Sequence, residues 1–98
     1  MKKYYSDYVG HCARFYFNTD TTPSPVEKKV EYNNYVAVSN VLDRYEKDVA
    51  LMIRYAYTSE SIPKAVGEIS ARKKCKPEAV WYTIQTFEKD VAIERGLL

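Results

Sequence analysis

Two amphipathic segments joined by a short basic turn are the sequence feature that most constrains this chain. They lie in the stretch from Pro63 to Arg95, and the turn is too polar to be part of a core. The apolar residues recur at helical spacing in two sets, Val66 and Ile69, then Val80, Ile84, Phe87 and Val91. Such spacing places each set on one face of its own helix. Pro77 suits a first helical position, where its missing N–H is harmless. The stretch therefore predicts helices over 63–72 and 77–95.

The turn concentrates the positive charge of the chain. The net charge is only +2, and residues 1–60 are neutral, with eight basic and eight acidic side chains. Between residues 64 and 77 there is one acid, Glu68, against five basic residues: Lys64, Arg72, Lys73, Lys74 and Lys76. A local patch of this kind attracts polyanions. Two short helices with a basic turn match the outline of a DNA-binding helix-turn-helix, although a solvated loop in an ordinary helical bundle is the alternative.

The remaining segments predict one all-α domain over residues 1–98. Residues 4–18 form an N-terminal helix, residues 18–25 a linker with two prolines, and residues 26–96 a helical bundle. The second helix is expected to begin near Ser24, with Pro25 at its first position. No strand-like alternation occurs. We therefore expect about five helices in a small orthogonal bundle, with a helix-turn-helix at the C-terminal end.

The helical stripes also predict the core. The expected core residues are Cys12, Phe15, Val38, Leu42, Met52, Ile53, Ile69, Val80, Ile84 and Phe87. Ser61 is expected to cap the helix over 63–72, and Gly96 to end the last helix. The chain has ten tyrosines, which suit half-buried seams between helices because each has a large ring and a polar tip. Stacking platforms for single-stranded nucleic acid are the alternative for these rings.

No pattern in the chain indicates an enzyme, a metal site or a cofactor. Cys12 and Cys75 lie far apart, and His11 is the single histidine, so no metal-ligand spacing occurs. There is no recognisable carboxylate pair, glycine-rich phosphate loop or nucleophile–base arrangement. No apolar run is long enough to span a membrane, and the N-terminus does not resemble a signal peptide. We therefore expect a cytoplasmic protein with reduced thiols and no membrane partner.

Several segments resemble region 4 of bacterial sigma factors over residues 36–96. The segments that carry the resemblance are Val41–Tyr45, Asp48–Tyr55, Ile69–Ser70, Cys75–Pro77 and Val80–Trp81. Small phage transcriptional regulators of the ArpU and RinA type share this layout, and the opening DYVGHCARFYF is similar to their N-terminal helix. The resemblance implies binding to double-stranded DNA and control of phage or mobile-element transcription. It also leaves a contact with RNA polymerase open.

The turn departs from the sigma-factor pattern, which usually reads IAxxLGIS. In this chain the same positions run from Ile69 to Lys76. Lys73 replaces an apolar anchor, and Lys74 replaces a glycine that accepts a positive φ easily. Lys76 replaces a serine cap, a loss of about 1 kcal/mol. These changes weaken the motif and add positive charge.

The residues expected to contact DNA fall into two groups. The phosphate contacts are assigned to Lys64, Arg72, Lys73, Lys74 and Lys76. If the stripe from Val80 to Val91 faces inward, the outward residues of the last helix are the candidates for reading bases: Glu78, Tyr82, Gln85, Thr86 and Lys89. An ordinary hydrated helix face is the alternative for the second group.

A second hypothesis keeps the helices but assigns them to protein contacts. The chain would then be a phage assembly or packaging component, or another interaction module, that uses its helices to oligomerise. Apolar residues outside the inward stripe predict a homodimer seam through Ile93, Leu97 and Leu98. The same seam would serve a DNA-binding dimer, because helix-turn-helix proteins often bind two half-sites.

Overall fold

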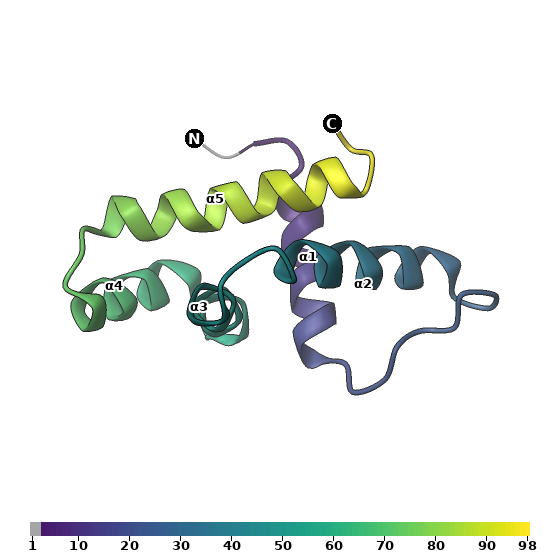
Figure 1. The fold of residues 1–98 in the computed structure, drawn as a ribbon, viewed down its shortest axis with the longest axis horizontal. Coiled ribbons are helices and arrows are strands. Elements are labelled where there is room, and N and C mark those ends of the chain that lie inside the picture. The colour runs from purple at the N-terminus through teal and green to yellow at the C-terminus, as the bar shows by residue number, and fades with distance from the viewer. Residues whose placement is uncertain (1–2) are drawn as a thin grey trace.

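The structure is a computed structural model that describes residues 3–98 and folds into five helices. They are α1 (Ser6–Asn18), α2 (Lys29–Leu42), α3 (Lys47–Thr58), α4 (Ile62–Lys73) and α5 (Pro77–Glu94). The described part of the chain contains no strand. Figure 1 shows α1 crossing α5 steeply and α3 nearly end-on, whereas α2, α4 and α5 run roughly along the long axis of the molecule. The prediction of an all-α bundle with about five helices is confirmed.

The core forms where α5 meets α1, α2 and α4. Seven of the ten predicted core residues are buried: Cys12, Val38, Ile53, Ile69, Val80, Ile84 and Phe87. Leu42 and Met52 are half-buried and pack against the core. Phe15 is half-buried and lies outside the core cluster, so its assignment to the core is wrong. The cause is the rotation of α1, which turns Val9 and Ala13 fully inward and leaves Phe15 at the edge.

The ends of α4 and α5 follow their sequence signals. The Ser61 hydroxyl accepts a hydrogen bond from the Lys64 N–H at 3.5 Å, which confirms the predicted cap. Gly96 has a φ of 76° and closes α5. Its N–H donates to the Ile93 carbonyl at 3.0 Å, while the Leu97 N–H donates to the Ala92 carbonyl at 2.8 Å. This pair of bonds is a Schellman motif, which needs the left-handed backbone that glycine adopts without strain.

The predicted starts of the first two helices are too early. α1 begins at Ser6 instead of residue 4, and α2 begins at Lys29 instead of near Ser24. Ser24 does cap a turn, because its hydroxyl accepts from the N–H groups of Val26 and Glu27. At Lys28, however, φ is −128° and ψ is 59°, which is not helical. Val26 is almost fully exposed, so no packing holds this first turn in line with α2.

Two tyrosines join helices through carboxylates on α5. The Tyr57 hydroxyl donates to Glu88 at 2.6 Å, and the Tyr45 hydroxyl donates to Asp90 at 2.7 Å. Tyr45 achieves this because α2 ends at Leu42 and the following turn directs the ring towards α5. Burial, together with the neighbouring carboxylate, raises the pKa of both hydroxyls. Tyr45 and Tyr57 thus fill seams between helices as predicted, whereas Tyr4 and Tyr82 are exposed at 80% and 71%.

Replacing the buried Ile84 tests the inward direction of α5. Its side chain is 1% exposed, so we expect Ile84→Ala to lower the free energy of unfolding by about 2–5 kcal/mol, because it leaves a cavity. Denaturant unfolding followed by circular dichroism measures this loss. The adjacent Gln85 is exposed, and Gln85→Ala should change stability by less than about 0.5 kcal/mol. Equal effects of the two substitutions would contradict the assigned direction.

Candidate nucleic-acid interface

The turn between α4 and α5 places a lysine in a left-handed conformation. Lys74 has φ 53° and ψ 45°, and it is the single non-glycine residue with a positive φ in the described chain. Its N–H and that of Cys75 both donate to the Ser70 carbonyl, the second at 3.1 Å. Lys76 then adopts an extended backbone, with no side-chain cap, and Pro77 starts α5. The turn therefore has a lysine in the left-handed conformation where the sigma-factor pattern has a glycine, and an uncapped lysine where that pattern has a serine.

The structure separates the five basic residues assigned to phosphates. Lys74 and Lys76 are exposed in the turn itself. Lys64 lies in the first turn of α4, about 14 Å from Lys73 at about 1.5 Å per residue. Arg72 and Lys73 line a groove against α3, where the Lys73 Nζ lies 3.9 Å from the Asp48 Oδ2. The turn thus brings two of the five together, with Arg72 and Lys73 beside them on the α3 side.

The five candidates for base reading lie on α5, on the side away from the core. Glu78, Tyr82, Gln85 and Lys89 are exposed, and Tyr82 is the most prominent aromatic ring of this face, with 71% of its surface accessible. Thr86 is half-buried, because it lies at the border of the face. The outward set predicted from helical geometry is therefore exposed except at its edge.

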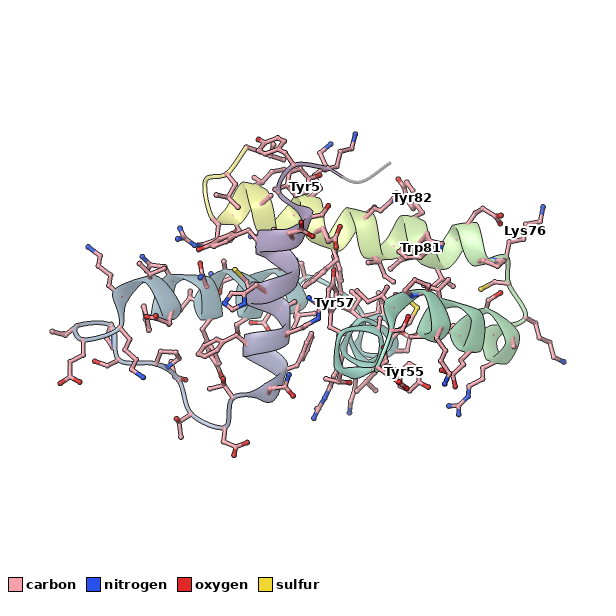
Figure 2. The ribbon with its side chains drawn as sticks, turned by 180° about the vertical axis from the view of Figure 1, so that it is seen from behind. Tyr5, Tyr55, Tyr57, Lys76, Trp81 and Tyr82 are labelled. Carbon is pink, nitrogen blue, oxygen red and sulfur yellow. The ribbon has the colours of Figure 1, made fainter. Side chains whose placement is uncertain are left out.

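This face lies at an end of the molecule that the other helices leave open. Figure 1 shows α4, the turn and the first half of α5 projecting away from α1 and α2. The side-chain hydrogen bonds that tie α5 to other helices begin at Glu88 and continue to Arg95. Before Glu88, the one side-chain hydrogen bond described on α5 lies within the helix, where the Thr83 hydroxyl donates to the Ala79 carbonyl. In Figure 2, Lys76 and Tyr82 point outward from this end.

Two features near the turn were not predicted from the sequence. Asp48 pairs with Lys73, and a groove between α3 and α4 exposes Leu51 and Tyr55. The exposed pair has a signal in the sequence, because Leu51 and Tyr55 are one helical turn apart and lie off the inward stripe of α3. The ion pair has no local signal, since its partners belong to different helices.

The described residues hold no group of three or more histidine, cysteine, aspartate or glutamate side chains suited to a metal ion. None of their helices is both long and apolar enough to cross a membrane. Comparisons with protein-family models, curated proteins and solved structures give no match to this chain. The resemblance to sigma-factor region 4 therefore stays a prediction from the residues.

A glycine at position 74 should stabilise the protein. A lysine in the left-handed region costs roughly 1–2 kcal/mol, whereas glycine adopts that backbone without a steric penalty. We expect Lys74→Gly to raise the free energy of unfolding by about 0.5–1 kcal/mol, after the larger entropy of the unfolded chain is subtracted. Denaturant unfolding measures the gain.

Two variants separate backbone strain from charge. Lys74→Ala removes the charge and keeps the strain, so it should not reproduce the gain. Lys76→Gly introduces the same residue where φ is −75°, and it should give no stabilisation. A glycine variant at position 74 no more stable than the alanine variant would show that the turn carries no strain.

Proposed function

We propose that this protein binds double-stranded DNA through α4, the turn and α5, with the first half of α5 in the major groove. The observation that carries the proposal is the exposed polar face of α5, directly after two free lysines, at an open end of the molecule. A helix of this kind fits the major groove, and its first residues approach the base edges. The role that the sigma-factor and phage-regulator resemblance supports is control of phage or mobile-element transcription.

The side chains on this face have the chemistry for two kinds of contact. Lys74 and Lys76 supply positive charge for phosphates, and such contacts fix the register without reading sequence. Gln85 can form a bidentate pair with adenine, and Glu78 can accept a hydrogen bond from cytosine. Tyr82 and Lys89 extend the face along the helix. Thr86, at its border, is the least accessible candidate.

The salt dependence of binding to mixed-sequence duplex DNA tests this proposal. Each phosphate contact contributes about 0.9 to the slope of log K against log salt. We expect the double variant with Lys74→Ala and Lys76→Ala to weaken binding to all duplexes equally and to reduce the slope by about 1.8. Lys28→Ala is the matched control, because Lys28 is exposed near the start of α2, away from this end. If the wild-type protein shows no salt-sensitive affinity at low ionic strength, the proposal fails.

Substitution of the α5 face should have a different effect. Once a preferred site has been selected from random duplexes, Gln85→Ala should reduce the preference for it by about 1–3 kcal/mol per lost base contact. Affinity for mixed-sequence DNA should remain unchanged, because Gln85 is uncharged. A uniform loss on every duplex would assign Gln85 to backbone contacts.

Self-association is the second candidate, and it rests on two exposed apolar side chains. Ile93 and Leu98 are 52% and 54% exposed near the end of α5. Leu97, the third residue of the predicted seam, is half-buried against the core, and its carbonyl accepts a hydrogen bond from Tyr4. Leu97 is therefore largely inaccessible to a second copy, because the turn at Gly96 folds it back onto the core.

Sedimentation at micromolar concentration tests this seam. We expect the wild-type protein to form a dimer and Ile93→Glu to remain monomeric, because a charge on each copy would meet its symmetry mate across the seam. Gln85→Glu is the matched control, since it adds the same charge to α5 outside the seam. A monomer at all concentrations would remove this candidate and leave the DNA proposal intact.

A further inference from the structure

The groove between α3 and α4 is separate from the proposed DNA-binding face. Its volume is about 230 Å³, and it is lined by Asp48, Leu51, Met52, Tyr55, Ile69, Arg72 and Lys73. Figure 2 shows Tyr55 and Tyr82 on opposite sides of the unit formed by α3, α4 and α5. A molecule bound in this groove would therefore leave the exposed face of α5 free.

Two apolar side chains of the groove, Leu51 and Tyr55, are exposed, whereas the other two, Met52 and Ile69, also pack in or against the core. Leu51 and Tyr55 are 54% and 39% exposed, one turn apart on α3. The inward side of the same helix is provided by other residues, among them Ile53 and Tyr57, which are buried. Each Å² of apolar surface that a partner covers contributes about 25 cal/mol. Covering Leu51 and Tyr55 with a partner would therefore contribute favourable binding free energy, because both side chains are exposed in the isolated chain.

The rim of the groove is positive. Arg72 forms no ion pair with the described residues, and Lys73 meets Asp48 at the long distance of 3.9 Å. Lys47 and Arg54 are exposed and flank Leu51 on α3, four residues before it and three after it. Asp48 is the acidic side chain in the lining of the groove, and Glu60 and Glu68 line the neighbouring pocket on the other side of Tyr55. The neighbouring Glu68 carboxylate raises the pKa of the Tyr55 hydroxyl. Among the lining residues, Arg72 and Lys73 against Asp48 leave one excess positive charge, and the unpaired Arg72 favours an acidic partner.

The size and chemistry of the groove select the kind of partner. Clefts for small molecules usually measure about 300–1,000 Å³, so this one suits the side chains of a larger partner. Phosphates gain nothing from Leu51 and Met52, which disfavours a nucleic acid. We propose that the groove binds a short amphipathic helix of another protein, with leucine or aromatic anchors on one face and aspartate or glutamate beside them. The anchors cover Leu51 and Tyr55, and a carboxylate pairs with Arg72.

The position of the groove gives the protein two independent contacts. The peptide site does not depend on DNA binding. Simultaneous binding of both partners rests on the proposed function, and it would make the chain a bridge between a duplex and an acidic protein segment.

A peptide titration of the full chain, observed through its backbone amide NMR signals, tests the site. The probe is an acetylated and amidated helical peptide with leucines at i and i+4 and glutamates beside them. Its counterpart has lysine at each glutamate position. We expect the acidic peptide to shift signals of α3 and α4 around Leu51, and the basic peptide to bind at least about tenfold more weakly, or about 1.4 kcal/mol.

Variants assign the binding to the groove. Leu51→Glu should lower the affinity for the acidic peptide by at least about tenfold, because it places a carboxylate among the apolar side chains of the groove. Val30→Glu is the matched control, since Val30 is a similarly exposed apolar residue on α2, at 57%. Both substitutions are at exposed positions, and the dispersion of the free-protein spectrum verifies folding.

Four results would overturn the proposal. They are shifts confined to the face of α5, equal binding of the two peptides, equal effects of Leu51→Glu and Val30→Glu, or no binding at millimolar peptide. A monomer–dimer equilibrium that Leu51→Glu abolishes without peptide would assign the groove to a second copy instead. Because this titration contains no DNA, an absence of peptide binding would not contradict the proposed DNA binding. An absence of DNA binding would likewise not contradict the peptide site.

Discussion

One half-buried carboxylate on α5 holds three helices together. Glu88 accepts hydrogen bonds from the hydroxyl of Tyr57 on α3, at 2.6 Å, and from the hydroxyl of Ser6 on α1, at 3.2 Å. A carboxylate withdrawn from water is expensive to leave unpaired, so it strongly favours the arrangement that supplies both donors. The Tyr57 ring is buried against Phe87, at 5.7 Å between ring centres, and the Arg14 guanidinium lies over the Tyr57 ring, 5.8 Å from its centre. The polar and apolar contacts of α5 thus fix the same orientation of α1 and α3.

The sequence predicted α4 and α5 closely because strong local signals mark their ends. Ser61 provides a cap, Pro77 starts a helix, and Gly96 ends one, and each acts within a few residues of its own position. The start of α2 was missed because Ser24 and Pro25 look the same whether one turn or a whole helix follows. Only tertiary packing decides between these outcomes, and Val26 has none. Phe15 was misplaced for the same reason, since several apolar residues of α1 compete for the core and the neighbouring helices select among them.

The sequence predicted which face of α5 is exposed, but it did not predict the contacts between α3 and α4. The inward stripe of α5 fixed its outward face, so the exposure of Glu78 and Tyr82 followed from helical geometry alone. Lys74 has its positive φ at the position where the sigma-factor pattern has a glycine, although its own residue type gives no signal for it. Where Lys73 points depends on Asp48, twenty-five positions earlier on another helix, and no local rule supplies that contact. The groove beside it arises in the same way, because its walls come from two helices.

The side-chain hydrogen bonds from α5 to other helices are concentrated in its second half, and this affects where the helix can unfold locally. Its second half is connected by side-chain hydrogen bonds through Glu88, Asp90, Glu94 and Arg95, whereas its first half is held by the burial of Val80 and Ile84. Segments with fewer tertiary contacts open at a lower free energy than the whole domain. The exposed start of α5, before the buried Val80, can therefore exchange its amide hydrogens while the rest of the helix keeps its register. The free energy needed to open α5 locally should therefore decrease from its C-terminal half towards Pro77.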